Sequence, residues 1–179
     1  MTFNFRLATL KDIPVLKQVI ATSARQLASG DYSGEQIDAA LGSAWGVDTQ
    51  LIEDETYFVV EVAGAGIVGC GGWSFRGTLF GSDEQAGRES GVLDSTNEAA
   101  RIRAFFVHPD WSRRGIGRAL LEKCECAARL QGFKSTALIA TLPGQRLYRE
   151  CGYIGEERVE YPLPNGSTIT FVPMTKNLV

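Results

Sequence analysis

The amino-acid sequence predicts an α/β fold, because strand-like and helix-like segments alternate along its 179 residues. Segments with alternating apolar side chains indicate strands, and segments with apolar side chains three or four residues apart indicate helices. Neither an internal repeat nor a linker-like stretch interrupts this alternation. Residues 1–179 are therefore expected to form a single domain, which at this length needs no disulfide or metal to complete its core.

The first part of the sequence predicts a strand and two helices. In FNFRL, apolar and polar side chains alternate as they do in a strand. Thr9 and Asp12 resemble a capping box with Asp in place of the usual Glu, so a helix is expected to start there and to reach Leu27. Ser33 and Gln36 form a second such pair, which predicts a short helix over SGEQIDAAL.

The middle of the sequence predicts a β-hairpin followed by a long loop. The strand-like segments YFVVEV and IVGCGGWSF flank the glycine-bearing turn AGAG. Residues 76–100 are rich in Gly, Ser, Asp and Glu, and their apolar side chains follow neither period. A loop of this length in a compact domain is usually functional or mobile. We therefore expect Gly81 to Ser95 to cap a substrate and to be mobile without it.

The last part of the sequence predicts strands that alternate with helices. ARIRAFFV is strand-like, and the apolar residues Ile116, Leu120, Cys124 and Ala127 then recur at helical spacing until Gly132. KSTALIATL predicts another strand, and GQRLYRECG predicts a short helix. Two final strands, YIGEERVEY and STITFVPMT, are expected around the turn PLPNG.

The composition argues against several classes of protein. The formal net charge of −3 argues against a nucleic-acid binder, which usually carries a basic face. The first residues, MTFNFRLATL, resemble no targeting peptide, and no apolar run approaches the ~20 residues that span a membrane. Four cysteines without CxxC spacing and a single histidine predict free thiols and no metal site. These features together predict a cytoplasmic protein that binds neither a membrane nor nucleic acid.

The segment RRGIGRA joins a strand to the long amphipathic helix and is a candidate phosphate site. A helix start presents unpaired backbone N–H groups and partial positive charge, glycines let an anion approach the backbone, and arginines add forked donors. The local pattern equally allows a plain glycine turn with solvated arginines. Two common nucleotide motifs are excluded, because no Gly-Lys-Ser/Thr follows and Leu120 stands where GxGxxG needs its third glycine.

The segment Arg114–Ala119 has the pattern R-x-x-G-x-A and resembles the pyrophosphate loop of GNAT-superfamily N-acetyltransferases. LYRECGY resembles the later family segment in which a tyrosine faces the sulfur of acetyl-CoA. The order of the expected elements is also similar to that of the family over nearly the whole chain. The resemblance implies an α/β fold of the GNAT type, with a mixed central sheet of about seven strands flanked by helices.

The resemblance also implies roles for individual residues toward acetyl-CoA. Tyr148 would protonate the departing thiolate, so it is the expected catalytic residue. In the family a strand bulge opens a slot, in which a backbone amide would polarise the thioester carbonyl. The strand residues expected to pair with the pantetheine arm there are Phe105, Phe106 and Val107. The residues expected to bind the pyrophosphate are Arg113, Arg114, Gly115, Ile116, Gly117, Arg118 and Ala119.

Two positions depart from the family pattern. Pro143 stands where many relatives carry an asparagine that contacts pantetheine. Where some relatives place a glutamate base on the strand, this sequence has Arg101 and Arg103, with Glu98 just upstream. The general base is therefore unassigned, and a chain of water molecules is the alternative. His108 is the single histidine, and in VHPD it is expected to be a surface turn residue.

The acceptor side of the predicted site is less defined than the cofactor side. Trp45, Trp73 and Phe75 either wall an acceptor pocket or belong to the core, where aromatic residues of a hairpin usually lie. The acidic residues of the long loop either attract a cationic amine or are only solvated. These acidic residues are Asp83, Glu84, Glu89 and Asp94.

The sequence and the resemblance together predict an acetyl-CoA-dependent N-acetyltransferase that acts on the primary amine of a small molecule. The resemblance implies that the amine attacks the thioester directly in a ternary complex, and the absence of a cysteine in a recognisable nucleophile context fits this path. Alternatives stay open: a protein N-terminal or lysine acetyltransferase, a non-catalytic acyl-CoA-binding regulator and, more remotely, a nucleotide-binding protein. The sequence also leaves open a homodimer.

Overall fold

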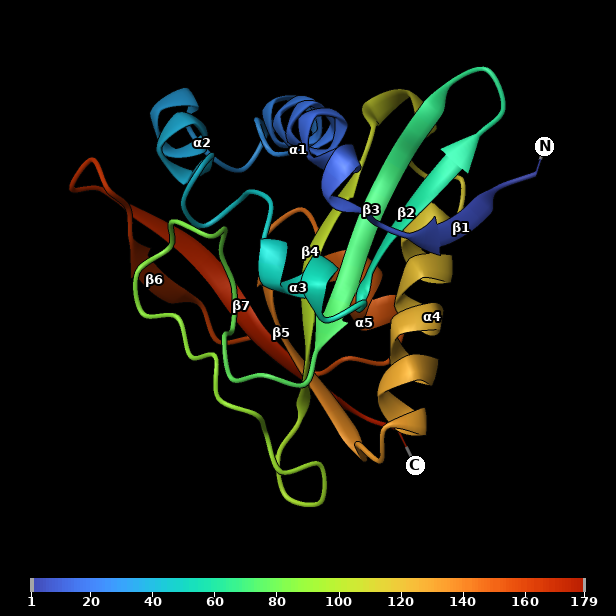
Figure 1. Ribbon diagram of the computed structural model, residues 1–179. Helices are drawn as coiled ribbons and strands as arrows, with labels where there is room; N and C mark the ends of the chain where they lie inside the picture. The colour runs from blue at the N-terminus through green and yellow to red at the C-terminus, as the bar shows by residue number, and fades with distance from the viewer. Residues whose placement is uncertain (1, 179) are drawn as a thin grey trace.

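The computed structural model describes residues 2–178 and is built around one seven-stranded sheet (Figure 1). The strands are β1 (Asn4–Leu7), β2 (Tyr57–Val62), β3 (Gly66–Ser74), β4 (Ala100–Val107), β5 (Ser135–Thr141), β6 (Val159–Pro162) and β7 (Thr168–Asn177). Their order across the sheet is β1-β2-β3-β4-β5-β7-β6. Every neighbouring pair is antiparallel except β4 and β5, which are parallel. The predicted mixed sheet of seven strands is thereby confirmed.

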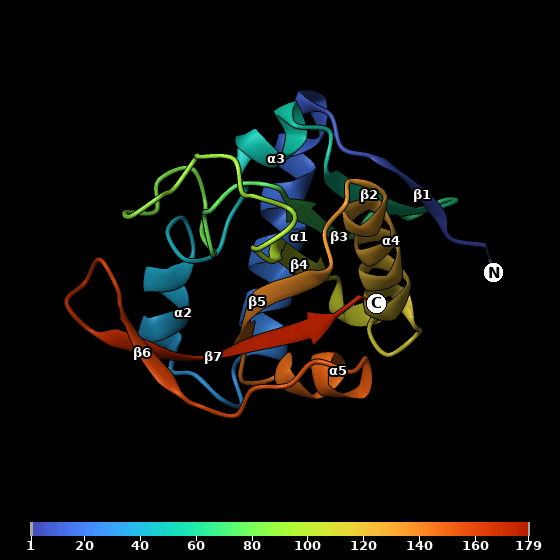
Figure 2. The same ribbon diagram turned by 90° about the horizontal axis from the view of Figure 1, so that it is seen from below.

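Helices cover both faces of this sheet (Figure 2). The helices and 3-10 turns are η1 (Leu10–Asp12), α1 (Ile13–Leu27), α2 (Gly34–Ala40), α3 (Thr49–Glu53), η2 (Pro109–Trp111), α4 (Ile116–Leu130) and α5 (Gln145–Glu150). Helices α4 and α5 pack on one face, whereas α1 and α2 pack on the other. None of the helices within residues 2–178 is long and apolar enough to cross a membrane.

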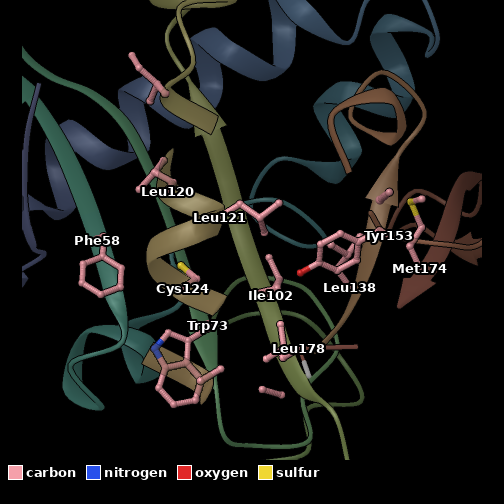
Figure 3. Packing of buried hydrophobic residues seen from close by; sticks show 14 of the residues in the cluster. Phe58, Trp73, Ile102, Leu120, Leu121, Cys124, Leu138, Tyr153, Met174 and Leu178 are labelled. Atoms are coloured by element: carbon pink, nitrogen blue, oxygen red, sulfur yellow. The ribbon is translucent and has the colours of Figure 1, made fainter. Parts of the chain in front are cut away.

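The strands contribute buried side chains to one core cluster on the α4 face and to two on the opposite face. On the α4 face, Leu120 and Cys124 of the helix pack with Phe58 and Ile102 of the sheet (Figure 3). On the opposite face, Leu16 of α1 packs against the other side of β2. Because β2 and β3 are covered on both faces, almost all of their side chains are buried, which explains their near-continuous apolar sequence.

Both predicted capping pairs form, but only the second opens an α-helix directly. The Asp12 carboxylate accepts a hydrogen bond from the Thr9 amide (2.7 Å), yet this pair encloses η1, and α1 begins one residue later. Pro14 occupies the first turn of α1, where its missing N–H has no consequence. Ser33 and Gln36 exchange hydrogen bonds of 3.1 and 2.9 Å at the start of α2, as expected.

The strand expected over YIGEERVEY is shorter in the structure, where β6 begins only at Val159. Ile154 forms an isolated bridge to Thr175, and the ladder does not continue from it. Gly155, with a φ of 150°, lies so close to β7 that an added Cβ would be 2.1 Å from the Pro173 carbonyl oxygen. This close approach separates the isolated bridge from β6.

The long loop between β3 and β4 contains neither a helix nor a strand within residues 76–99, in agreement with the sequence prediction. Ion pairs nevertheless tie it to the body of the protein. Arg76 pairs with Asp54 (2.7 Å), and Arg88 pairs with Asp48 (2.8 Å), which also caps α3. The one-turn helix α3 is absent from the sequence prediction, because five residues are too few to display a helical period.

Candidate active site

A pocket of about 590 Å³ opens where β4 and β5 separate. The two strands pair only at Ala100 with Thr136 and at Arg101 with Ala137. Parallel neighbours normally stay ~4.8 Å apart, so beyond these pairs the facing N–H and C=O groups of β4 have no strand partner in β5. Residues 102–107 line the pocket from β4, including the predicted Phe105, Phe106 and Val107. From β5, it is lined by Leu138, Ile139 and Thr141.

A bulge in β4 accompanies this separation. Ala104 has a φ of 53°, a left-handed conformation that residues with a side chain rarely adopt. The register between β3 and β4 shifts at the same point, as in a β-bulge. Gly71 is required on β3, because a Cβ there would lie 2.7 Å from the Phe105 ring. Phe105 packs against the α4-side core and Phe106 against the α1 side, so the pocket reaches both faces of the sheet.

The start of α4 forms one end of the pocket. Arg113 and Gly115 both adopt left-handed backbone conformations, with φ values of 59° and 84°. Two such residues immediately before a helix are typical of a backbone concavity that binds anions. Arg146 of α5 also lines this end, although sequence reasoning missed it. The residues of the predicted loop that line the pocket are Arg113, Gly115, Ile116, Gly117 and Arg118.

Two residues of the predicted loop lie outside the pocket lining. The guanidinium group of Arg114 lies over the Trp111 ring (4.8 Å to the centroid) and donates to the Asp110 carbonyl oxygen (3.1 Å). The Ala119 amide donates to the Gly115 carbonyl oxygen (3.0 Å) as part of α4. This helical bond occupies the Ala119 N–H, and the predicted role of Ala119 toward the pyrophosphate stays a prediction.

Gly117 brings α5 close to the first turn of α4. A Cβ at this position would lie 2.9 Å from Cδ2 of Leu147, which is tighter than side chains normally pack. The glycine therefore permits close helix packing, a role separate from any contact with an anion. Because Leu147 precedes Tyr148, the same contact holds the predicted catalytic residue beside the basic end of the pocket.

Tyr148 lines the pocket between its two ends and is half-buried. Its ring packs edge-on against Phe105 (6.3 Å between centroids) and Tyr153 (5.8 Å). Burial, with smaller contributions from the nearby Cys124 and Cys151, raises the pKa of the Tyr148 hydroxyl well above its usual value. The hydroxyl therefore keeps its proton at neutral pH, which is the state that a proton donor requires.

The other end of the pocket, on the α1 face, is an apolar chamber. Its walls are Ala24, Leu27, Ala28, Trp45, Leu79, Phe80 and Phe171. The Phe171 ring anchors the aromatic wall, with its centroid 6.3 Å from Trp45 and 5.7 Å from Phe80. Trp73 and Phe75 are not part of this wall, because Trp73 packs in the α4-side core (Figure 3) and Phe75 packs edge-on against it. Of the three candidate aromatic residues, only Trp45 lines the pocket.

The acidic residues of the long loop lie outside the pocket lining; they are Asp83, Glu84, Glu89 and Asp94. Asp83 accepts from the first amide of α3 (2.8 Å), and Asp94 accepts from an amide in its own turn (2.9 Å). Glu98 accepts from the Asp94 amide (2.7 Å), so it also serves this turn. In the lining as described for residues 2–178, Glu150 is the single carboxylate, and it lies beside Arg146 at the α4 end.

Of the two remaining sequence candidates, Pro143 lines the pocket and His108 does not. Pro143 lines the pocket next to Gly144, whose amide donates to the Thr141 hydroxyl (3.1 Å) at the entry to α5. His108 lies outside the lining, and its Nδ1 accepts from the Asp110 amide (3.3 Å) at the start of η2. His108 is therefore a turn residue, as its sequence context predicts.

The sequence analysis did not predict that Arg103 is buried. It lines the pocket from β4, yet it is only 3% exposed. Its guanidinium group pairs with Asp48 (2.8 Å), a residue 55 positions earlier in the chain and also buried. A charged residue in a strand usually indicates a solvent-exposed position, so only knowledge of the Asp48 contact could have predicted the burial of Arg103.

Comparison with known proteins agrees with this geometry. Residues 53–154 match the family model of the acetyltransferase (GNAT) domain. No curated protein matches the sequence significantly. A GCN5-related N-acetyltransferase structure from Rhodopseudomonas palustris has 20% identity and a TM-score of 0.71, covering 99% of this chain and 96% of that one.

Two further structures have the same fold over nearly their whole length. The PaiA N-acetyltransferase of Thermoplasma acidophilum, in complex with coenzyme A, has 15% identity, a TM-score of 0.68 and 99% coverage of both chains. The ribosomal-protein alanine N-acetyltransferase of Escherichia coli has 15% identity and a TM-score of 0.59, covering 99% of this chain and 94% of that one. At these identities the likeness concerns the fold alone.

Proposed function

Since the chain belongs to the GNAT family and is an N-acetyltransferase, we propose that it transfers the acetyl group of acetyl-CoA to the primary amine of a small molecule. The observation that carries this proposal is a single pocket that runs from the start of α4, past Tyr148, to the apolar chamber. The basic end of the pocket can bind the anionic phosphates of acetyl-CoA, and the slot between β4 and β5 can hold its extended pantetheine arm. The apolar chamber then remains for the acceptor.

The residues of the α4 end fit the donor chemically. Backbone N–H groups around Gly115 and Gly117 would hold the pyrophosphate, with the guanidinium groups of Arg113 and Arg118 at the rim. Arg146 adds positive charge from α5. The edge of β4 that β5 leaves unpaired would hydrogen-bond the amides of the pantetheine arm. When bound, acetyl-CoA supplies an activated acyl thioester.

Two groups of the protein would then assist acyl transfer. A backbone N–H of the bulged part of β4 polarises the thioester carbonyl and stabilises the negative charge that develops on its oxygen. The Tyr148 hydroxyl donates its proton to the sulfur as the carbon–sulfur bond breaks. Burial raises the pKa of the Tyr148 hydroxyl, so the group is protonated at neutral pH, as a proton donor must be.

Direct attack by the amine is favoured over an acyl-enzyme. None of the cysteines within residues 2–178 lines the pocket. Cys70 and Cys124 are buried in the cores, and burial raises the pKa of the Cys70 thiol to about 12, which suppresses its thiolate form. In the described lining neither a carboxylate nor a histidine is part of the apolar chamber, and the nearby Asp48 is paired with two arginines, so the proton of the amine leaves through water.

A small acceptor is favoured over a protein acceptor by the walls of the chamber. The loop segment around Phe80 packs edge-on against Phe171 and Tyr161, and the ion pairs of Arg76 and Arg88 fasten the same loop. The loop segment that forms one wall of the chamber is thus held in place, and a protein terminus or a lysine-bearing segment would have to enter beside it. A protein N-terminal or lysine acetyltransferase remains the second candidate.

The proposal is tested by incubating the protein with acetyl-CoA and a panel of primary amines, following thiol release and acetylated amine together. We expect both products in equal amounts for at least one small amine. Intact-mass analysis after exposure to acetyl-CoA alone should find no acetylated cysteine. Tight acetyl-CoA binding in calorimetry without turnover of any amine or peptide would instead indicate a regulator, and turnover restricted to peptides would indicate the protein acetyltransferase.

A further inference from the structure

Arg103 carries a buried hydrogen-bond donor that the protein itself leaves unpaired. Its Nε–H has no partner among residues 2–178. Both other guanidinium nitrogens have partners, since Nη1 donates to the Thr78 carbonyl oxygen (3.2 Å) and Nη2 donates to Asp48 and to the Gly81 carbonyl oxygen (both 2.8 Å). Buried donors are nearly always paired in folded proteins, so an orphan beside a pocket points to a missing partner.

The cluster of charged groups around Arg103 carries more positive than negative charge, and Arg88 is its partly exposed member. Asp48 is 1% exposed, and its two oxygen atoms pair with two guanidinium groups, those of Arg103 and Arg88. Two cations share one carboxylate, so the cluster has an excess of one positive charge. The remainder of the apolar chamber offers no carboxylate within the described lining to balance it. An anionic partner would satisfy both the charge and the unpaired N–H.

The position of Arg103 along β4 sets where this anion would lie. Phe105, two residues further, contacts the Tyr148 ring at the reacting centre. The Ala104 bulge lies between these two residues, so Arg103 binds Asp48 on the α1 side, where the chamber lies, whereas Phe105 packs on the α4 side. A carboxylate on the acceptor would meet opposite charge in the chamber, whereas a second ammonium group would meet like charge. Aromatic and aliphatic walls complete the chamber.

We propose that the acceptor is an α-amino acid with an apolar side chain, whose carboxylate binds the Arg103 Nε–H while its side chain occupies the apolar chamber. The inference rests on the proposed function, because it assigns the acceptor of that same reaction. It makes Arg103 a substrate-binding residue and also explains why the loop acids play no part in the pocket. Cationic polyamines are correspondingly poor acceptors.

The first test compares kcat/KM for leucine, leucinamide and isopentylamine, with phenylalanine, phenylalaninamide and phenethylamine as a second series. We expect each amino acid to exceed its carboxylate-free analogues by roughly tenfold or more, since a site built to bind a polar group rejects analogues that lack it. The three amines of a series differ in basicity, so the ratio is compared between wild type and variants. Equal or better turnover of the carboxylate-free amines by the wild type would overturn the inference.

Two variants distinguish a role of Arg103 in substrate binding from a role in holding the loop in place. Arg103→Lys keeps a cation beside Asp48 but lacks the Nε–H, and we expect its preference for the amino acid to fall by roughly tenfold or more. Arg88→Lys is the matched control, because Arg88 pairs with the other oxygen of Asp48 and lies outside the pocket lining. This control should keep the preference. The same loss in both variants would show that Asp48 merely fastens the loop, and would overturn the inference.

A binding measurement distinguishes failure of the inference from failure of the proposed function. N-acetylleucine and N-isopentylacetamide are titrated calorimetrically into the wild-type protein and Arg103→Lys, each saturated with CoA. If the wild type, but not Arg103→Lys, binds N-acetylleucine more tightly than N-isopentylacetamide, the inference is supported even where no amine is turned over. The absence of turnover would by itself refute the proposed reaction. Turnover of amines with no carboxylate preference in either assay would refute the inference and leave the acetyltransferase proposal intact.

Discussion

The two ends of the pocket are built from different parts of the polypeptide. The α4 end comes mainly from one short segment, RRGIGRA, and presents the backbone of a helix start with glycines that permit close approach. The apolar chamber comes from side chains of α1, β4, β7 and the segments around Trp45 and Phe80. A backbone site depends on local conformation, whereas a side-chain site depends on tertiary contacts. The donor can therefore be inferred from a motif, and the acceptor requires the structure.

The largest expected effect concerns the ion pairs that hold the chamber side together. Asp48→Asn leaves two arginines without their shared carboxylate, and breaking a buried pair in this way should lower the free energy of unfolding by about 3 kcal/mol. Denaturant unfolding measures this loss. Calorimetry below the transition should find acetyl-CoA affinity changed by less than roughly threefold, because the α4 end is built separately.

The matched control for that prediction is Asp38→Asn, which removes the partner of Arg25 in an ion pair whose side chains are 60% and 67% exposed. Exposed pairs contribute little, so its unfolding free energy should stay within about 0.5 kcal/mol of the wild-type value. A loss of acetyl-CoA affinity in Asp48→Asn as large as the loss of stability would show that the two ends are not independent.

The next effect concerns Tyr148, which lies between the two ends. Tyr148→Phe removes the proposed proton donor and keeps the ring that packs against Phe105 and Tyr153. General acid catalysis contributes ~10²–10⁴-fold, and because a thiolate is a fairly stable leaving group, we expect kcat to fall about 10²-fold. Affinity for acetyl-CoA and the thermal midpoint should change little. A folded variant with wild-type kcat, where chemistry limits the rate, would exclude Tyr148 as the donor.

A smaller effect is expected at the backbone end. Gly117→Asp introduces negative charge beside the anion site and a Cβ within 2.9 Å of Leu147, so acetyl-CoA affinity should fall by roughly tenfold, about 1.4 kcal/mol. Gly117→Ala adds the same Cβ without the charge and should lose less. Calorimetry on both folded variants separates the two contributions. Unchanged affinity in Gly117→Asp would mean that the segment is only a turn.

The smallest effect concerns pH. Burial raises the pKa of the Tyr148 hydroxyl above its usual ~10, and the protonated form is the active one. Activity that depends on this proton is therefore complete below the raised pKa and is lost only as pH rises through it. With the amine saturating, kcat of the wild type should not decline between pH 7 and about pH 10. A decline in that range that disappears in Tyr148→Phe would contradict the assignment.

Much of the fold follows from local sequence patterns. Three patterns reflect which side chains are buried, so the corresponding elements were predicted. These are the alternation in FNFRL, the apolar hairpin and the helical spacing from Ile116 to Ala127. β6 was predicted too long, because the close approach of Gly155 to Pro173 depends on a strand that follows it in the chain. The helix α3 escaped prediction, because its short length leaves only the Asp48 cap as a signal.

The site residues also differ in how far they could be predicted, depending on whether their contacts are local in the chain. The sequence motifs pointed to Tyr148 and to the loop segment, most of which lines the pocket, because these motifs are contiguous; their roles stay predictions. Arg103 could not, because its burial depends on Asp48, 55 residues away, and on carbonyl groups of an irregular loop. Trp45, Trp73 and Phe75 looked equivalent in the sequence, although two of them face the opposite side of the sheet from the chamber.

The two residue pairs that join β4 to β5 also bear on how the chain folds. Strands β1 to β4 pair only with one another apart from this join, and β5, β6 and β7 form a second set. Within each set, pairing requires no contact with the other half of the chain, so each can close its own loops first. Helix α4 packs on β3, β4 and β5 and so spans the join. The slot thus lies between these two sets of strands. We expect the hydrogen bonds that border it to form late in folding and to exchange early with solvent hydrogen.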